Sequence, residues 1–322
     1  MSVSSKIYKG MIKALSKVVE GGSIPMPDKK EVIEADENAE LNFIAWGDPQ
    51  ISFISPLRSA RVYAACRDVD NARGRFDALF LLGDITEYGA ECEYKTAAYL
   101  INGINDKIDK VFAVSGNHDI RLRNYKKQLY RFNCFLSSIN GGVKGSDEHY
   151  CFSYDLKGYK LIFLGADRTC FEGTHISKRQ LVWLEKELNE ADGSKPVFVF
   201  NHQALKGTNG LPMTWLGRGK WRGTVGWDND RLRAVLEKRK NVIYITGHLH
   251  YGISEYTYED LGNIKAVSVP TVGVLNHGPC DKLSQGIVFS VYNDKIVGKS
   301  RVFGEGRYVE DSVSNSAFTI EL

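Results

Sequence analysis

Residues 110–119 read KVFAVSGNHD, a short apolar run that ends abruptly in glycine, asparagine, histidine and aspartate. Apolar runs of this length, bounded by turn signals, predict buried β-strands. The same unit recurs along the chain, and most of its copies are followed directly by side chains that can do chemistry. The other runs of this kind are 41–46, 78–82, 160–164, 196–200 and 241–245.

Helix-like patterns separate several of these strands. Alternation of strands and helices predicts an α/β fold in which helices cover the faces of the sheets. After residue 250 only strand-like runs remain, so the C-terminal part is expected to extend the sheets. Helices are expected at 59–71, 91–105, 177–189 and 229–238, and late strands at 253–258, 264–269, 286–291, 295–302 and 318–322.

The composition is that of a globular protein. Of the 322 residues, 43% are hydrophobic and 25% are charged, so extended disorder and a fibrous structure are not expected. The net charge of +3 does not favour nucleic-acid binding, and no apolar run is long enough for a transmembrane helix. The six cysteines are scattered without a CxxC pair, which excludes a zinc ribbon and favours a cytoplasmic protein with reduced thiols.

The first 20 residues have a different pattern. Apolar residues recur near helical spacing between four lysines, which predicts a basic amphipathic helix rather than a signal peptide. Such a helix can pack on its own domain, or it can attach to an anionic membrane or to a protein partner. Glycines, prolines and acidic residues follow it, so we predict an N-terminal helix and linker over 1–40 and one domain over 41–322.

The polar side chains at the strand ends have the composition of a metal site. Because strands of an α/β sheet end at a common edge, side chains that follow different strands are expected to converge there. Carboxylates and imidazoles bind Zn, Mn and Fe(II), and two ions about 3.5–4 Å apart can stabilise a displacement at phosphorus. Seven side chains are candidate ligands, too many for one tetrahedral ion: Asp48, Gln50, Asp84, Asn117, His202, His248 and His250.

These motifs, in this order, resemble the calcineurin-like metallophosphoesterase superfamily, whose pattern is D-x-H, G-D, G-N-H-[DE], H and G-H-x-H. The nearest branch is that of the class III cyclic-nucleotide phosphodiesterases, because G-D-I-T-E-Y-G at 83–89 is similar to its G-D-L-T-x-x-G. The resemblance implies an αββα four-layer sandwich of two mixed β-sheets flanked by helices. The matching segments are D-P-Q at 48–50, G-D at 83–84, G-N-H-D at 116–119, His202 and G-H-L-H at 247–250.

The resemblance also implies a role for each candidate. His118 would contact the phosphate and protonate the leaving oxygen, and Asp119 would orient His118 or tune its pKa. A hydroxide that bridges two divalent ions would be the nucleophile; Mn is favoured, with Fe, Zn or Mg as alternatives. The implied ligands are Asp48, Gln50 and His250 for one metal, Asn117, His202 and His248 for the other, and Asp84 for both.

Gln50 departs from the family pattern, which has histidine at this position. Glutamine offers a neutral amide oxygen or no bond, so the first metal site is expected to be weaker, less suited to zinc and more tolerant of Mn or Mg. The long connection between His202 and Asp228 is expected to be either a lid that contacts the substrate or a surface loop pinned to the domain. Candidate substrate contacts are Asn117, His118, Arg121, Arg218 and Arg222.

The sequence therefore favours a metal-dependent phosphoesterase that acts on a small phosphorylated substrate. A phosphodiester or nucleotide is slightly favoured over a monoester on the resemblance alone. The alternative is a weakened or inactive metallophosphoesterase fold that binds a protein partner, with Gln50 as the first sign of decay. A nuclease is disfavoured because no basic tract lies near the motifs outside residues 206–222. The oligomeric state is left open.

Overall fold

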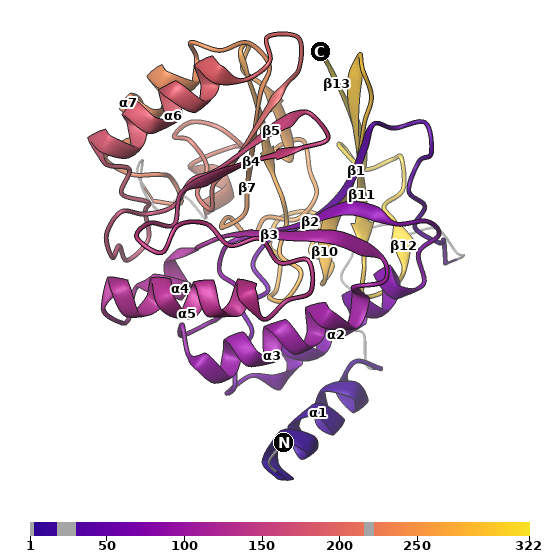
Figure 1. Cartoon of the computed structure of the whole chain (residues 1–322). Coiled ribbons are helices and arrows are strands. Elements are labelled where there is room, and N and C mark those ends of the chain that lie inside the picture. The colour runs from indigo at the N-terminus through magenta and orange to yellow at the C-terminus, as the bar shows by residue number, and fades with distance from the viewer. Residues whose placement is uncertain (1–2, 18–29, 216–221) are drawn as a thin grey trace.

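Two β-sheets packed face to face form the centre of the molecule, and helices cover the outer face of each sheet (Figure 1). This computed structural model describes residues 3–17, 30–215 and 222–322. The αββα four-layer sandwich of two mixed sheets is therefore confirmed. One outer layer of Figure 1 contains α6 (Lys178–Glu190) and α7 (Asn229–Leu236), and the other contains α2 (Pro56–Asp70), α3 (Glu91–Ile101) and α5 (Tyr125–Ser137).

The first sheet combines a parallel and an antiparallel half. Its strands are β1 (Leu41–Trp46), β2 (Phe76–Leu82), β3 (Ile108–Val114), β10 (Gln285–Val291), β11 (Lys295–Val302), β12 (Arg307–Tyr308) and β13 (Ala317–Glu321). Their order is β12-β11-β10-β1-β2-β3, and β13 pairs with β11. The first three strands along the chain run parallel, as expected for strands joined by helices, and β10 runs antiparallel to β1.

The second sheet has the order β4-β5-β6-β7-β9-β8. Its four central strands are parallel, and antiparallel partners flank them on both edges. The strands are β4 (Phe152–Leu156), β5 (Tyr159–Phe163), β6 (Val197–Phe200), β7 (Val242–Thr246), β8 (Tyr258–Asp260) and β9 (Ile264–Ser268).

Aromatic side chains fill the space between the two sheets. Phe80 of β2 stacks on Phe200 of β6 with ring centroids 4.3 Å apart, and Phe43 of β1 meets Phe198 edge to face at 5.7 Å. Successive residues of a strand point to opposite faces, so the intervening residues pack against the helices. All six residues of β1 are buried for this reason, which explains why the sequence shows a continuous apolar run here.

Shorter elements complete the fold. α1 (Val3–Leu15) lies outside α2 at the lower edge of Figure 1. The connections also contain η1 (Asn102–Ile104), α4 (Asn117–Ile120) and η2 (Met213–Trp215). None of the helices in the described part of the chain is long and apolar enough to cross a membrane.

Most elements expected from the sequence are present within a few residues. The helix expected at 177–189 is α6, and Ser177 caps it, because its hydroxyl accepts a hydrogen bond of 3.2 Å from the Gln180 amide. The strand expected at 253–258 is wrong, since the Thr257 amide donates to the Ser254 carbonyl at 3.0 Å and closes a turn. The sequence patterns did not predict α5 or β4, and β4 is a half-exposed edge strand without a continuous apolar run. The boundary at residue 40 stays a prediction.

Candidate metal centre

Polar side chains that follow five strands, β1, β2, β3, β6 and β7, meet between the two sheets. Asp84, His202 and His248 form one group of possible metal ligands, and Asp48, Asp84 and His250 form a second. Within each group the ligand atoms lie within 4.8 Å of one another. Two adjoining groups that share a carboxylate are the arrangement of a two-metal site with Asp84 as the bridge.

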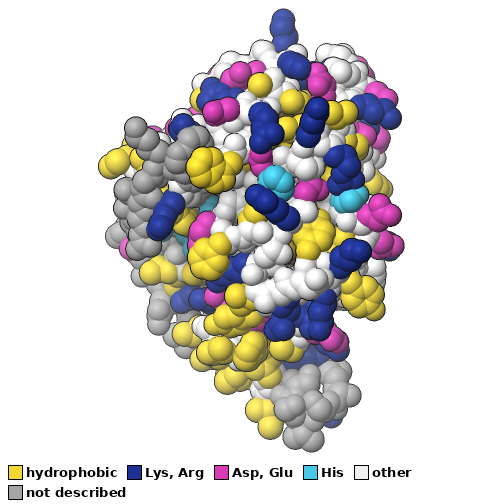
Figure 2. Space-filling model, turned by 90° about the vertical axis from the view of Figure 1, so that its left-hand side faces the viewer, with side chains coloured by type: hydrophobic (Ala, Val, Ile, Leu, Met, Phe, Trp, Pro, Cys, Tyr) yellow, Lys and Arg dark blue, Asp and Glu magenta, His cyan; other side chains and the backbone are white. Residues whose placement is uncertain are grey.

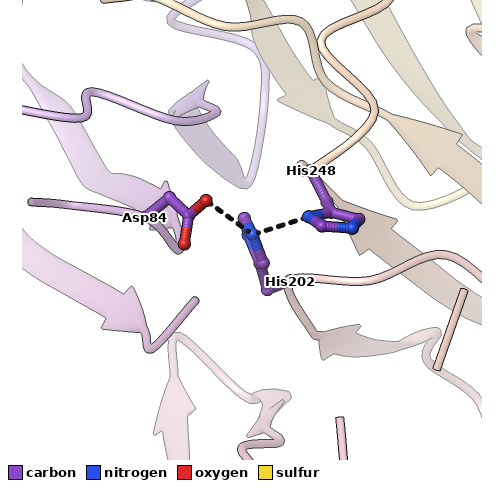
Figure 3. Close-up of side chains that lie close together, drawn as sticks. All are labelled: Asp84, His202 and His248. Carbon is purple, nitrogen blue, oxygen red and sulfur yellow. Dashed lines mark hydrogen bonds and ion pairs between the residues drawn. The ribbon is translucent and has the colours of Figure 1, made fainter. Parts of the chain in front are cut away.

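His202 lies between the other two members of the first group (Figure 3). Its Nε2 is 3.3 Å from Asp84 Oδ2 and 3.1 Å from His248 Nδ1. Its Nδ1 lies 2.6 Å from the carbonyl oxygen of Leu82. A backbone acceptor at Nδ1 places the proton of the neutral ring there, so Nε2 presents its lone pair to a cation.

Asp48 joins the second group to the first. Its Oδ1 lies 3.0 Å from His250 Nε2, and its Oδ2 accepts a hydrogen bond of 2.8 Å from the His248 backbone amide. The Thr271 hydroxyl donates to the Asp48 carbonyl at 2.8 Å, which fixes the turn that follows β1. Segments 200 or more residues away in the sequence therefore hold this carboxylate in place.

The turns that carry these side chains have an unfavourable backbone conformation. Ten described non-glycine residues have positive φ, and five of them belong to this centre. Such conformations cost about 1–3 kcal/mol each and persist where the surrounding structure enforces them, often at functional sites. Here they occur in the turns directly after the strands, where the chain bends and presents these side chains to the common site. The five are Asp48 (47°), Gln50 (38°), Asp84 (48°), His248 (69°) and His250 (48°).

Glycines precede the ligands because a side chain there would collide with a ligand from another strand. A Cβ atom on Gly83 would lie 2.3 Å from His202 Nδ1, and one on Gly116 would lie 2.1 Å from Asp84 Oδ1. A Cβ atom on Gly247 would lie 2.7 Å from a carboxylate oxygen of the centre. The three motif glycines are therefore needed for the close approach of the strand ends.

Burial and opposite charge shift the pKa values of the ligands. Burial raises the pKa of Asp84, but the imidazoles of His202 and His118 outweigh it and hold that pKa well below its usual range. Burial lowers the pKa of His202, but Asp84 and Asp48 outweigh it and raise that pKa to about 9. Burial, followed by the charge of His202, lowers the pKa of His248. The two buried carboxylates thus demand positive charge beside them, which an imidazolium or a metal ion can supply.

The donor set fits divalent transition metals, which bind carboxylate oxygen and imidazole nitrogen together. His248 Nε2 is buried and has no hydrogen-bond partner in the described part of the chain, so this nitrogen is available as a ligand. Trp215 stacks on the His248 ring with centroids 4.7 Å apart. Trp215 therefore packs one end of η2 against a candidate ligand.

Gln50 lies inside the centre and is 3% exposed. Its side-chain amide nitrogen is 3.5 Å from Asp84 Oδ2, a long hydrogen bond. Rotation of the terminal amide by half a turn places the oxygen at the same position, where it can face a cation. The structure therefore brings Gln50 to the ligands, and its coordination of a metal stays a prediction.

Asn117 begins α4 directly after β3 and is buried. The Gln203 amide nitrogen lies 3.5 Å from Asn117 Oδ1 and donates to the Glu172 carbonyl at 2.8 Å. Gln203 also accepts a hydrogen bond from the Thr174 hydroxyl. The sequence analysis did not identify Gln203, although its place next to His202 was the available signal. Gln203 orients the Asn117 amide toward the ligands.

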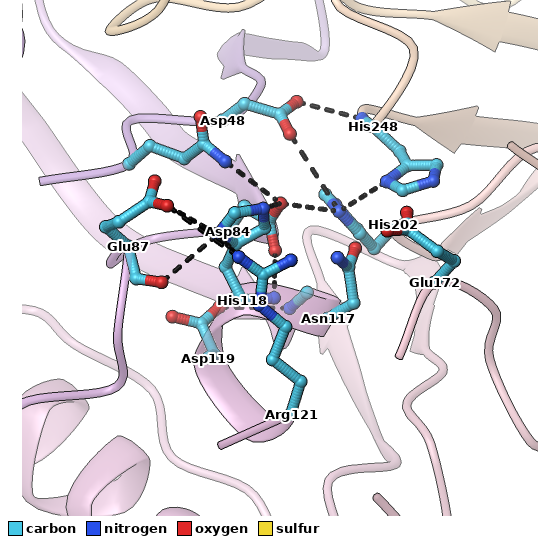
Figure 4. A network of polar contacts seen from close by, with 12 residues as sticks. Asp48, Asp84, Glu87, Asn117, His118, Asp119, Arg121, Glu172, His202 and His248 are labelled. Atoms are coloured by element: carbon cyan, nitrogen blue, oxygen red, sulfur yellow. Dashed lines mark hydrogen bonds and ion pairs between the residues drawn. The ribbon is translucent and has the colours of Figure 1, made fainter. Parts of the chain in front are cut away.

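His118 borders the ligands and is held by Glu87 (Figure 4). Its Nδ1 lies 3.1 Å from the backbone oxygen and 3.3 Å from the carboxylate of Glu87, and its Nε2 lies 3.8 Å from Asp84 Oδ2. Nδ1 thus lies beside two acceptors of Glu87 and beside the Arg121 guanidinium, which can only donate, while Nε2 lies on the side of the metal ligands. Burial lowers the pKa of His118, but Asp84 and Glu87 outweigh it and raise that pKa. The sequence analysis assigned no role to Glu87.

Two arginines extend this network. Arg58 of α2 forms an ion pair with Glu87. The Arg121 guanidinium lies 2.9 Å from His118 Nδ1 and 3.7 Å from the Glu87 carboxylate, and it packs over the ring of Phe171. Arg121 is therefore next to the expected phosphate contact His118 and shares the Glu87 carboxylate with it and with Arg58.

Asp119 follows His118 in the sequence and has hydrogen-bond partners of its own. Its buried carboxylate accepts five hydrogen bonds, which join the turns after β2 and β3. Burial, followed by the charge of Asp84, raises the pKa of Asp119 to about 6. The carboxylate that contacts the His118 ring is Glu87, and a role of Asp119 in orienting His118 or tuning its pKa stays a prediction. The five donors are the backbone amides of Ile85, Thr86 and Gly116 and the hydroxyls of Thr86 and Tyr94.

The remaining candidates lie on the long connection. Arg222 is exposed, and no hydrogen bond or ion pair joins it to the ligands within the described ranges. Arg218 lies outside the described residues. Their assignment as substrate contacts stays a prediction.

Comparisons with known proteins agree with this geometry. The family model for calcineurin-like phosphoesterases matches residues 43–252, which include every candidate ligand. The chain is 23% identical over 193 residues to a probable glycerophosphodiester phosphodiesterase of Arcobacter nitrofigilis, covering 59% of this chain and 62% of that protein. It is 26% identical over 194 residues to a probable cyclic nucleotide phosphodiesterase of Rhodococcus erythropolis, covering 60% of this chain and 58% of that protein.

The chain thus spans about three fifths of the length of these two relatives. Among solved structures, the purple acid phosphatase PPD1 of yellow lupin (Lupinus luteus) superimposes with a TM-score of 0.60 at 14% identity, covering 92% of this chain and 55% of that one. At this identity the likeness concerns the fold alone.

Proposed function

The chain belongs to the calcineurin-like phosphoesterase family, and we propose that it hydrolyses phosphodiesters with two divalent cations. The observation that carries this proposal is the pair of ligand groups that share the buried carboxylate of Asp84. A single ion would leave one group without a cation, whereas two adjacent ions use both groups and place positive charge on both sides of Asp84.

The proposed ligands form two cation positions. Gln50 is proposed to offer its amide oxygen to the first position. When bound, the cations supply Lewis acidity that polarises the phosphoryl group and lowers the pKa of water. We favour Mn, because a glutamine in place of an imidazole makes the first position harder and less suited to zinc. Fe, Zn and Mg are the alternatives. The first position has Asp48, Gln50 and His250, the second has Asn117, His202 and His248, and Asp84 serves both.

The chain's own proton donor is His118. Its Nε2 faces the ligand groups, and the raised pKa that Asp84 and Glu87 produce favours a protonated ring. We propose that this nitrogen gives its proton to the leaving oxygen while Glu87 holds the opposite nitrogen. Arg121 and Asn117 are neighbours of His118, and both are proposed to contact the phosphate oxygens.

A diester is favoured over a monoester as the substrate. Both relatives named above are phosphodiesterases by name, and this likeness is what favours the diester; His118 can protonate the alkoxide that leaves from either kind of ester. The identity of the two alcohols is left open. A cytoplasmic location remains a prediction from the sequence.

The test is hydrolysis of an aryl phosphodiester and the matching monoester by protein loaded in turn with Mn, Fe, Zn and Mg. We expect faster turnover of the diester and the highest rate with Mn. His118→Ala should slow turnover while bound metal per chain stays the same, and His149→Ala, at a histidine beside Arg179 and away from the centre, should change neither. No turnover with any metal, together with no bound metal, would favour the partner-binding scaffold instead. Loss of metal from His118→Ala would contradict the assignment of His118.

A further inference from the structure

α1 contacts the rest of the molecule through one face. Ile12 is 1% exposed, and Tyr8 and Leu15, which are one turn away from it in either direction, pack against the same core. The Tyr8 hydroxyl donates to the Ser52 carbonyl oxygen at 2.9 Å. This bond attaches the helix to the loop that follows β1 and Gln50.

A second apolar stripe of the same helix faces away from that core. Ile7 and Met11, which are one turn apart, are 67% and 39% exposed. The Tyr8 bond attaches α1 at Ser52, the residue directly before Phe53 and Ile54, which are themselves 54% and 65% exposed. We call the following five residues the docking patch: Ile7, Met11, Phe53, Ile54 and Leu57.

The charge around the docking patch has one sign. Residues 3–17 contain four lysines and no acidic residue, and residues 51–57 contain no charged residue. On the neighbouring helix α3, Glu91 is paired with Lys95, and Glu93 is buried with 1% exposure. Figure 2 shows hydrophobic side chains gathered on the lower part of one face, at the level of α1, with Lys and Arg between them.

We propose that the docking patch and the lysines of α1 bind the surface of an anionic phospholipid bilayer. Soluble proteins seldom expose several large apolar side chains together unless that surface contacts a partner or a membrane. A helix that lies flat on a membrane inserts apolar side chains between the headgroups while its lysines pair with lipid phosphates. The uniform positive charge matches such a surface, and the apolar side chains supply the insertion.

The position of the docking patch determines which side of the molecule would face the membrane. Phe53 is three residues after Gln50, and the amide of Gln50 donates to the Asp84 carbonyl at 2.8 Å. The docking patch therefore continues from the turn that forms the rim of the metal centre. A protein bound through the docking patch holds this rim next to the lipid headgroups.

The experiment is co-sedimentation of the full chain with phosphatidylcholine vesicles that contain or lack phosphatidylserine. We expect binding only to the anionic vesicles, and weaker binding as salt is raised. The double variant Ile7→Ser/Phe53→Ser should bind at least about tenfold more weakly, because two large side chains lose their burial. Lys6→Glu/Lys13→Glu should have a similar effect through charge alone. Matched controls on α6 are Val182→Ser, at a side chain that is 61% exposed, and Lys178→Glu, and both should bind like the wild type.

Three results would overturn the proposal. The first is an absence of wild-type binding to the anionic vesicles, and the second is an equal loss of binding in the α6 controls. The third is a wild-type dimer that Ile7→Ser/Phe53→Ser converts to a monomer in gel filtration, because the docking patch would then be covered by a second copy of the chain. Thermal unfolding checks that each variant is folded. If the apolar double variant does not fold, the exposed lysine pair decides the outcome.

Discussion

The metal centre and the ion pair between Asp68 and Arg301 both bury carboxylates, but the negative charge is neutralised differently in the two regions. Arg301 is 0% exposed, and its Nε and Nη2 donate to the two carboxylate oxygens of Asp68 at 2.6 and 2.8 Å. Tyr308 lies over the same guanidinium, 4.6 Å away. The Asp68 carboxylate therefore has a permanently charged guanidinium as its partner. In the metal centre, the cationic groups that the described part of the chain places beside Asp48 and Asp84 are imidazoles, which can lose their charge, so the negative charge is balanced by protons or by metal ions.

The two regions also differ in backbone conformation. Asp68 lies on α2 and Arg301 on β11, both in regular structure, whereas five residues of the metal centre have positive φ. Regular elements suffice to pair two long side chains from neighbouring layers. Convergence of several short side chains on one point requires strained turns, and the surrounding fold must hold them. The metal centre therefore differs from the Asp68–Arg301 ion pair in two ways. Its buried carboxylates leave negative charge that an external cation can balance, and its ligands lie on strained turns.

Asp84→Asn is the most direct test of this difference between the metal centre and the Asp68–Arg301 pair. Loss of the shared carboxylate should remove at least one cation and lower kcat/KM by about a thousandfold or more, since both ligand groups lose a charge. The metal-free protein should lose less unfolding free energy than in Asp68→Asn, because His202 can release its proton once Asp84 is neutral, whereas Arg301 cannot lose its charge. Metal content, activity and chemical denaturation check these outcomes. Strong destabilisation would mean that the two regions do not differ as described.

Asp68→Asn should have the opposite effect. Arg301 would be left buried without its charge partner, which costs about 3 kcal/mol or more of unfolding free energy. Bound metal and kcat of the remaining folded protein should stay unchanged. Urea denaturation of variant and wild type measures the first quantity, and metal analysis of folded protein measures the second. A variant that keeps its stability would contradict a structural role for the pair.

Glu87→Gln should lower kcat by about ten- to a hundredfold, because His118 would lose the carboxylate that orients it. Cation content and KM should change little, since Glu87 touches no proposed ligand of the metals. Asp119→Asn is the informative contrast, because it should mainly lower stability by weakening the hydrogen bonds between two turns. If Asp119→Asn lowers kcat without affecting stability, the roles of the two carboxylates would have to be exchanged.

The pH dependence of cation binding should be the smallest of these effects. The pKa of His202 is raised to about 9, so at pH 7 this ring carries a proton that a cation must displace. Apparent affinity should therefore rise up to about tenfold per pH unit below pH 9, with proton release on binding. The protonated ring also stabilises the metal-free fold below pH about 6.5, and this contribution is lost as pH rises through about 9. Calorimetry in buffers of different ionisation enthalpy measures the released protons, and none would contradict the shift.

Much of the fold was predictable because local patterns report burial. Continuous apolar runs identified the inner strands, and a capping serine located the start of α6. Residues 254–257 form a turn and not part of the strand expected at 253–258. The preceding Ile253 is buried as a strand residue would be, but outside a sheet. The family pattern likewise identified the candidate ligands, since chemistry fixes their residue types.

The sequence by itself determined the layered α/β architecture and the residue types at each strand end. Those features depend on local hydrophobicity and on short spacings, which a linear pattern records. Only the tertiary structure decided which carboxylate touches His118, because the adjacent Asp119 points into the turns after β2 and β3, whereas Glu87, 31 residues away in the sequence, reaches the ring. It also decided that α1 leaves Ile7 and Met11 exposed, because contacts between distant segments depend on packing and not on spacing.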